Sequence, residues 1–183
     1  MSDTAIDKEA LRREVDEALH DQKKEPVAPS GFELNANSRV KHVIGVVSGK
    51  GGVGKSLVAG ILATNLMRAG KRVGILDGDI TGPSIPKMFG LSGVHAHGEN
   101  DQLVPVSEAR GIKIMSANLV LQNETDPVLW RGPVVAGAIQ QFYGQCNWGE
   151  LDYLLIDMPP GTGDVALTVF QSLPVEGIVI VSS

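Results

Sequence analysis

Residues 46–58 read VVSGKGGVGKSLV and contain the residue types that hold a polyphosphate. The segment matches the pattern G-x-x-x-x-G-K-S/T, with its first glycine at position 49. Glycines let such a loop turn its backbone N–H groups inward as an anion nest, and a helix that begins behind the loop adds partial positive charge. The lysine reaches the β- and γ-phosphates, and the serine hydroxyl ligates Mg²⁺. The predicted nucleotide-binding residues are Gly49, Lys50, Gly51, Gly52, Val53, Gly54, Lys55 and Ser56.

Lys50 is a second lysine at the mouth of the same loop, and the general pattern does not require it. A cation at this place is well positioned to reach a nucleotide in a facing subunit, where it would neutralise transition-state charge as an arginine finger does. The alternative is a solvent-exposed lysine without a role. We expect both Lys50 and Lys55 to be catalytic.

Acidic residues end two of the apolar runs that follow the loop. Asp77 ends KRVGILD, with Asp79 two residues later, and Asp157 ends LDYLLID. Open α/β sheets bind ligands at the carboxyl ends of their strands, so we expect these acids beside the loop. Asp157, with Ser56, is predicted to hold Mg²⁺, the acid through a water. Turn-forming or capping acids without chemistry are the alternative.

Apolar strands and helical segments alternate from position 40 onward. VKHVIGVVS, KRVGILD, GIKIMSA, LDYLLID and GIVIVSS are apolar enough for strands buried on both faces, as in parallel sheets covered by helices. Helices are predicted for KSLVAGILATNLMRAG, which ends at Gly70, for GPVVAGAIQQFYGQ, with Pro133 at its first position (N1), and for DVALTVFQSL, capped by Asp164. The alternation predicts an α/β fold with a doubly wound, mostly parallel sheet flanked by helices.

The chain divides by composition into two parts. Residues 1–38 are predicted to form a charged N-terminal helix and a linker, and residues 39–183 a P-loop domain. Leu11, Val15 and Leu19 recur every four residues and give the first segment a narrow apolar stripe. That stripe fits either a solvated helix or a helix that docks on a partner.

Composition also excludes several classes of protein. The net charge of −5 argues against a nucleic-acid-binding surface, and no apolar run approaches the ~20 residues that span a bilayer. MSDTAIDKEA lacks the apolar core of a signal peptide, so we expect a cytoplasmic protein. Cys146 is the single cysteine and is predicted to be a packed or half-exposed thiol, not a nucleophile. His95 and His97 are predicted to lie in a solvated loop.

The loop motif GKGGVGKS resembles the deviant Walker A motif of the P-loop family that includes MinD, ParA and the nitrogenase iron protein. In that family the early lysine, Lys50 here, acts across a nucleotide-sandwich dimer. ILDGDITGPSIPKMFG, LWRGPVVAGAIQQF and DYLLIDMPPGTGDVALT further resemble the Mrp/ApbC group of ATPases, which bind and transfer iron–sulfur clusters. The resemblance covers roughly residues 40–183.

This resemblance implies roles for residues outside the loop. Asp79 would begin the first switch and orient the attacking water, which makes it the third candidate catalytic residue. A second switch would reorder when the γ-phosphate leaves. The residues expected to act in switching are Asp77, Pro159, Pro160, Gly161 and Gly163.

The resemblance also implies ATP hydrolysis by a homodimer that uses ATP and Mg²⁺ and meets iron–sulfur client or scaffold proteins, without nucleic acid or membrane as partners. Relatives continue past GIVIVSS and carry a C-x-x-C pair that holds a bridging [4Fe–4S] cluster, whereas Cys146 matches neither position. We therefore expect a chain truncated at its C-terminus, without evident cluster ligands. The alternatives are a MinD/ParA-like positioning ATPase, a nucleotide-binding fragment without turnover, and a P-loop kinase or synthetase.

Overall fold

The computed structural model describes residues 33–79, 84–99, 102–120, 132–161 and 163–182. The predicted N-terminal helix, with its apolar stripe, lies outside the described residues. All helices and strands below belong to the unit formed by residues 31–183.

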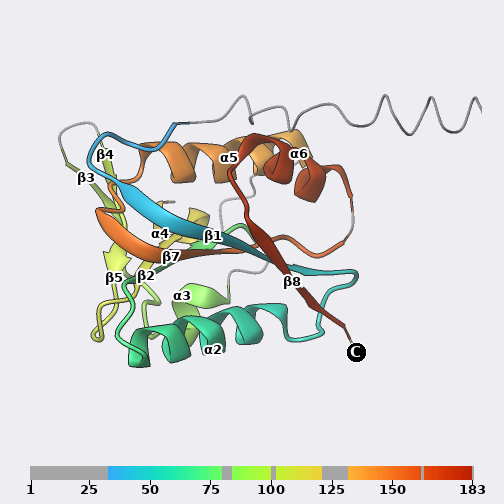
Figure 1. Cartoon of the computed structure of the whole chain (residues 1–183), viewed down its shortest axis with the longest axis horizontal. Helices are drawn as coiled ribbons and strands as arrows, with labels where there is room; N and C mark the ends of the chain where they lie inside the picture. Colours follow the sequence, from blue (N-terminus) through green and yellow to red (C-terminus); the bar gives the residue numbers. More distant parts are fainter. Residues whose placement is uncertain (1–32, 80–83, 100–101, 121–131, 162, 183) are drawn as a thin grey trace, which may run out of the picture. The chain divides into compact units, whose positions relative to one another are not determined.

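A six-stranded sheet forms the centre of this unit, in the order β5-β6-β2-β7-β1-β8 (Figure 1). All neighbouring strands are parallel except β5, which runs antiparallel to β6. The fold class predicted from the alternating pattern is confirmed. The strands are β1 Arg39–Ser48, β2 Val73–Asp77, β5 Val106–Ser107, β6 Lys113–Ser116, β7 Glu150–Asp157 and β8 Gly177–Val181.

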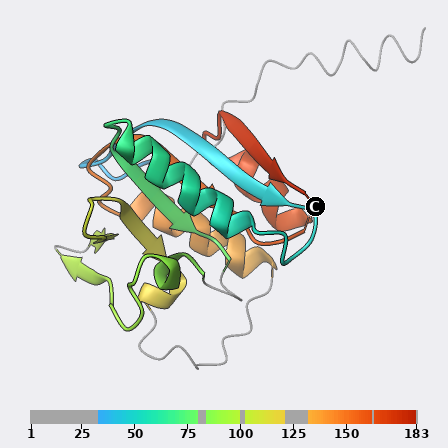
Figure 2. The same ribbon diagram turned by 90° about the horizontal axis from the view of Figure 1, so that it is seen from below.

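Helices cover both faces of the sheet. Figure 1 shows α5 and α6 on one face and α2 and α3 on the other, and Figure 2 shows α2 lying along the strands. Each face has its own apolar core, which explains why β2 is buried along its whole length. The helices are α2 Lys55–Arg68, α3 Ile85–Met88, α4 Ala117–Val120, α5 Gly132–Gln145 and α6 Asp164–Ser172. A small hairpin, β3 His97–Glu99 with β4 Gln102–Val104, lies outside the main sheet.

One predicted helix position is confirmed and two are wrong. Helix α5 begins at Gly132, so Pro133 is its second residue and not its first, as predicted. Gly70 has φ 76° and lies just beyond α2, so its predicted place at the helix end is confirmed. The prediction that Asp164 caps α6 is wrong. Gly163 occupies the cap position without a side-chain hydrogen bond, and Asp164 is the first helical residue, where its charge favours the helix dipole.

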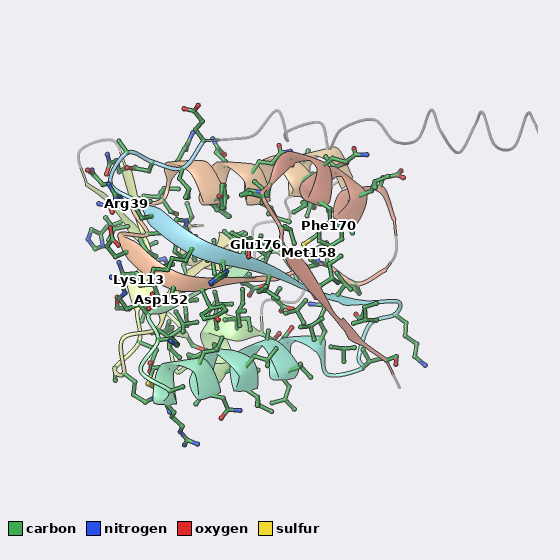
Figure 3. All side chains as sticks on the ribbon, viewed as in Figure 1. Arg39, Lys113, Asp152, Met158, Phe170 and Glu176 are labelled. Atoms are coloured by element: carbon green, nitrogen blue, oxygen red, sulfur yellow. The ribbon has the colours of Figure 1, made fainter. Side chains whose placement is uncertain are left out.

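Charged side chains gather at the amino ends of the strands. Lys41 Nζ lies 2.8 Å from Asp152 Oδ1, and Arg72 Nη2 lies 3.2 Å from the same oxygen. Figure 3 shows Arg39, Lys113 and Asp152 on this side of the molecule. The carboxyl ends of the strands, where a ligand is expected, are therefore at the opposite edge of the sheet.

Candidate functional site

The register of the sheet brings the loop and two of the acids together. Asp77 at the end of β2 is paired with Asp157 at the end of β7, and Asp157 is also paired with Val46 of β1. The loop that follows β1 therefore leaves the sheet next to both carboxyl groups. This is the edge where parallel α/β sheets bind ligands.

The loop has the backbone that an anion nest requires. Gly52 has φ 78° and Gly54 has φ 87°, a region that residues with a Cβ rarely adopt. Gly54 is also the cap residue of α2 and has no side-chain cap hydrogen bond. The first amides of α2 are thus left for a bound anion, as at other helix N-termini that hold phosphate.

A pocket of about 390 Å³, here called the loop pocket, opens at this point. Its size lies within the range of roughly 300–1,000 Å³ that small-molecule sites have. It unites residues from the loop, the first predicted switch and the second. Its lining residues are Ser48, Gly51, Gly52, Gly54, Lys55, Ser56, Leu57, Asp79, Ser84, Met88 and Pro160.

Lys55 is the central charge of the site. Its side chain is only 5% exposed, and its Nζ lies 2.6 Å from Asp157 Oδ1 and 4.0 Å from Asp79 Oδ2. Burial raises the pKa of Asp157, while the charge and hydrogen bond of Lys55 and the hydroxyl of Ser56 act against that rise. The structure thus brings Lys55, Ser56, Asp79 and Asp157 together, as the sequence predicted.

Asp77 is also buried, next to Asp157 on the neighbouring strand. The backbone N–H of Asp79 donates to Asp77 Oδ1 at 3.1 Å. Burial raises the pKa of Asp77 to about 8, and the charge of Asp157 adds to that rise. Burial and the neighbouring Asp157 therefore favour the protonated, neutral form of Asp77.

Three buried oxygens of the site have no hydrogen-bond partner within the described part of the chain. They are Ser48 Oγ, Asp77 Oδ2 and Asp157 Oδ2. Buried polar atoms normally have partners, and hard oxygen donors suit Mg²⁺, which usually binds one or two carboxylates, several waters and the phosphates of a substrate. The donor set therefore fits Mg²⁺ held jointly with a polyphosphate. The described residues offer no ready-made cage of three or more His, Cys, Asp or Glu side chains.

Ser48 was missed by the sequence analysis. It ends β1 directly before the loop, is 2% exposed and lines the loop pocket. A polar residue at the end of a buried strand, next to the glycine loop, is the signal that could have identified it.

The second predicted switch is bonded to the end of β1. Gly161 N–H donates to Ser48 O at 2.9 Å, and Met158 N–H donates to Val46 O at 3.0 Å. A Cβ added to Gly51 would lie 3.9 Å from Pro160 Cβ, so the glycine loop and this segment are neighbours. Pro159 is half-buried and Gly163 is exposed, and neither lines the loop pocket.

Lys50 is exposed and does not line the loop pocket. Among the described residues it has no ion pair or hydrogen bond, which leaves its ammonium available to another molecule. Gly49 is exposed and Val53 is half-buried, and neither lines the pocket. Lys50's action across subunits stays a prediction.

Cys146, His95 and His97 do not line the loop pocket. Cys146 is fully buried, and burial raises the pKa of its thiol to about 12, so the predicted packed thiol is confirmed. His95 and His97 are exposed, His97 at the start of β3. In the part of the chain that the structure describes, no helix is both long and apolar enough to cross a membrane.

Known protein families and sequences resemble this chain closely. A profile of the ParA-type family described as NUBPL iron-transfer P-loop NTPase matches residues 39–183. An iron-sulfur cluster carrier protein of Clostridium perfringens is 53% identical over 151 residues, which are 79% of this chain and 53% of that protein. A cytosolic Fe-S cluster assembly factor Nubp2 homolog of Drosophila grimshawi is 47% identical over 150 residues, which are 79% of this chain and 57% of that protein. The chain spans about half the length of the curated relatives it matches.

Solved structures of related proteins also align with this chain. A nucleotide-binding protein of Archaeoglobus fulgidus in complex with ADP aligns with a TM-score of 0.69 at 48% identity, covering 79% of this chain and 55% of that one. The MinC:MinD cell division protein complex of Aquifex aeolicus aligns with a TM-score of 0.53 at 22% identity, covering 76% of this chain and 55% of that one. The second likeness shows a shared fold alone.

Proposed function

The chain belongs to the NUBPL iron-transfer P-loop NTPase family, and from this premise we propose that residues 39–183 bind and hydrolyse ATP with Mg²⁺ within a nucleotide-switched carrier of iron–sulfur clusters. One observation carries the proposal. A glycine loop with left-handed φ values precedes helix α2 and lines a pocket, and in this pocket the buried Lys55 is paired with Asp157. The relative from Archaeoglobus fulgidus is in complex with ADP, which supports a nucleotide as the ligand.

The proposed chemistry uses these residues in separate roles. The amides of residues 51–54 and the N-terminus of α2 would hold the phosphates, and Lys55 would neutralise their charge. Ser56 and Asp157 would hold Mg²⁺, which when bound supplies further charge neutralisation at the phosphates. Asp79, which lines the pocket, would position a water for in-line attack on the γ-phosphorus.

Lys50 would complete the site of a second copy of the chain. It is exposed at the mouth of the loop and does not line its own pocket, so its charge is available to a facing molecule. We assign it to the nucleotide of the partner in a homodimer, where it would stabilise transition-state charge.

The iron–sulfur cluster is the proposed cargo. Its iron requires thiolate ligands, and Cys146 does not fit because its thiol is buried with a raised pKa. We therefore assign cluster ligation to none of the described residues. The partners proposed for the whole protein are iron–sulfur client or scaffold proteins, by its relationship to the carrier proteins.

The test is phosphate release from ATP at rising protein concentration, for the wild type and for Lys50→Ala. We expect the specific activity of the wild type to rise with concentration, and that of Lys50→Ala to stay at least about tenfold lower, as for loss of a cation supplied in trans. Lys71→Ala is the matched control, because Lys71 is exposed just beyond the far end of α2. Equal activity of Lys50→Ala and wild type at every concentration would exclude the role across subunits.

A further inference from the structure

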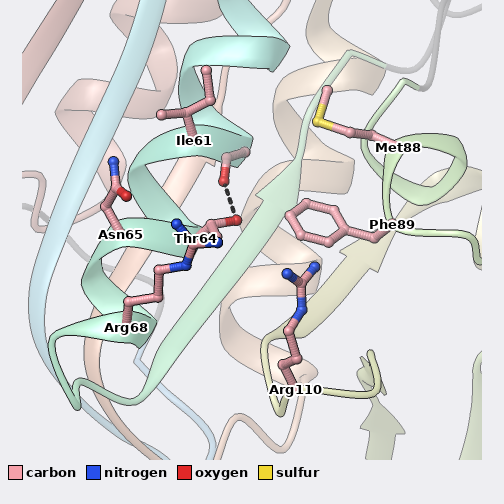
Figure 4. Close-up of a pocket in the computed structure, with 8 residues that line it drawn as sticks. Ile61, Thr64, Asn65, Arg68, Met88, Phe89 and Arg110 are labelled. Carbon is pink, nitrogen blue, oxygen red and sulfur yellow. Dashed lines mark hydrogen bonds between the residues drawn. The ribbon is translucent and has the colours of Figure 1, made fainter.

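A groove of about 250 Å³ lies beside the loop pocket, between α2, α3 and the turn that joins β5 to β6 (Figure 4). We call it the α2–α3 groove. Its apolar side consists of Ile61, Met88 and Phe89. Ile61 is 50% exposed and Met88 is 41% exposed, so two large apolar side chains face solvent in one depression.

Close packing at a glycine shapes the bottom of this groove. A Cβ added to Gly60 of α2 would lie 2.6 Å from Met88 Sδ, so α3 rests directly on the backbone of α2. Thr64 is held by a hydrogen bond from its hydroxyl to Gly60 O at 2.8 Å. The groove is thus a built feature of the α2–α3 contact and not a gap between loose side chains.

Two arginines supply its charge. Arg68 extends from the last turn of α2 and Arg110 from the β5–β6 turn, and Figure 4 shows both reaching toward the same opening as Phe89 and Met88. Arg110 Nε contacts Glu108 Oε2 at 3.3 Å, and the other carboxyl oxygen of Glu108 accepts from the Ile112 N–H. Arg68 has no ion pair or hydrogen bond within the described residues, so the groove presents excess positive charge on a chain of net charge −5.

Size and charge together indicate the occupant. The groove is smaller than the roughly 300–1,000 Å³ of sites that enclose a whole small molecule, but it has room for one or two side chains. Guanidinium groups bind carboxylates in a forked geometry. We propose that the α2–α3 groove binds a segment of a partner protein in which a carboxylate side chain lies beside a large apolar one.

Met88 connects this groove to the loop pocket, because it lines both. Its helix, α3, begins one residue after Ser84, which also lines the loop pocket. A segment seated against Met88 would therefore bear on α3 and on Ser84, which line the loop pocket together with Asp79. This coupling rests on the proposed nucleotide binding, whereas the groove itself does not.

The groove is tested on nucleotide-free protein with a fluorescein-labelled octapeptide of alternating glutamate and leucine, by fluorescence anisotropy. We expect saturable binding that Arg68→Glu weakens about tenfold, the usual effect of losing a charge-assisted contact. Ile61→Ser should weaken it about fivefold by removing apolar contact area. The control is Lys71→Glu, which changes the net charge equally but does not line the groove. Arg68→Gln repeats the test without reversing the charge.

Two results would overturn the groove as a docking site. One is that Lys71→Glu and Arg68→Glu weaken peptide binding equally, because the loss would then come from the net charge of the chain and not from a contact in the groove. The other is a wild-type affinity for an all-glutamate octapeptide that equals the affinity for the alternating one.

The coupling is tested by repeating the titration with a bound Mg²⁺–ATP analogue, and we expect the peptide affinity to change at least threefold in wild type but not in Met88→Ala. If the analogue binds but the peptide affinity of the wild type does not change, the coupling is contradicted. If the analogue does not bind, the proposed function is contradicted, while the peptide titration without nucleotide still tests the groove.

Discussion

Lys55 is one cation surrounded by three acids at the end of the sheet, and the balance among them decides what the site can hold. Asp157 is its direct partner, Asp79 lies at 4.0 Å, and Asp77 is buried behind them with a pKa raised to about 8. Burial favours the neutral form of Asp77, which limits the negative charge that a polyphosphate would meet. A proton on Asp77 thus favours anion binding at this edge.

The pH dependence of stability should show this proton. The pKa of Asp77 is about 8 in the folded chain, against about 4 in the unfolded chain, so the folded state binds the extra proton between these values. The free energy of unfolding should therefore fall as pH rises from about 4 to 8, by up to about 1.4 kcal/mol per pH unit from this group. Asp77→Asn should flatten the dependence in urea titrations of nucleotide-free protein at pH 5, 6, 7 and 8.

Asp152→Asn is the control for that experiment. Hydrogen bonds, first from Arg72, hold the pKa of Asp152 below its usual range, so its contribution is present above the unfolded value and is lost only as pH falls. The slope between pH 5 and 8 should be unchanged in this variant. A wild-type slope that Asp77→Asn leaves intact would contradict the assignment of the proton to Asp77.

The buried ion pair itself predicts a second effect. Lys55→Met would leave Asp157 buried without its partner, which typically costs about 3–5 kcal/mol, less whatever protonation of the acid recovers. We expect a loss of about 2–3 kcal/mol in the free energy of unfolding. Lys55→Met combined with Asp157→Asn should regain part of it. A single variant as stable as wild type in urea denaturation would show that the pair is not closed in solution.

The glycine spacing and the acids at strand ends could be predicted from the sequence, because backbone geometry and phosphate chemistry allow few residue types there. The direct contact of Lys55 with Asp157 could not. It depends on the register between β1 and β7, which juxtaposes residues about a hundred positions apart along the chain.

At the scale of elements, β2 is the strand on which both apolar cores converge. All five of its residues are buried. A Cβ added to Gly74 would meet the side chains of Leu151, Leu154 and Trp148. Long apolar runs made the main strands predictable. The two-residue strand β5 and the β3–β4 hairpin were not, because such short polar pairings depend on tertiary contacts that local pattern does not encode.

Two glycines give opposite predictions at this scale. A Cβ at Gly74 would lie 2.7 Å from Leu151 Cδ1, so Gly74→Ala should lower the free energy of unfolding by about 1–3 kcal/mol through overpacking. Gly137 in α5 has no atom within 4 Å of an added Cβ, so Gly137→Ala should raise it by about 0.5–1 kcal/mol. Denaturant titrations measure both. A destabilised Gly137→Ala would show that α5 packs differently at this point.

At the scale of the whole molecule, exposed ion pairs and the buried charged cluster lie at opposite edges of the sheet. Solvent-facing ion pairs, such as Lys41 with Asp152, lie at the amino ends of the strands, while the buried cluster lies at the carboxyl ends. The matched region, residues 39–183, contains the proposed phosphate-binding apparatus. A ligand bound only by the folded state should therefore stabilise this unit as a whole.

That stabilisation is measurable in the same denaturation experiment. Mg²⁺–ATP at a hundred times its dissociation constant should raise the free energy of unfolding by about 2.7 kcal/mol. Mg²⁺–AMP at the same concentration should give no comparable increase, because the loop holds the β- and γ-phosphates. Equal stabilisation by the two nucleotides would place the recognition elsewhere than the loop.

The most direct measurement is a calorimetric titration of the chain with Mg²⁺–ATP, beside the same titration of Lys55→Met confirmed as folded by circular dichroism. Saturable binding of one nucleotide per chain that the variant loses is the predicted result. Absence of heat in the wild type, or equal affinity in wild type and variant, would contradict a nucleotide held by the glycine loop and its buried lysine.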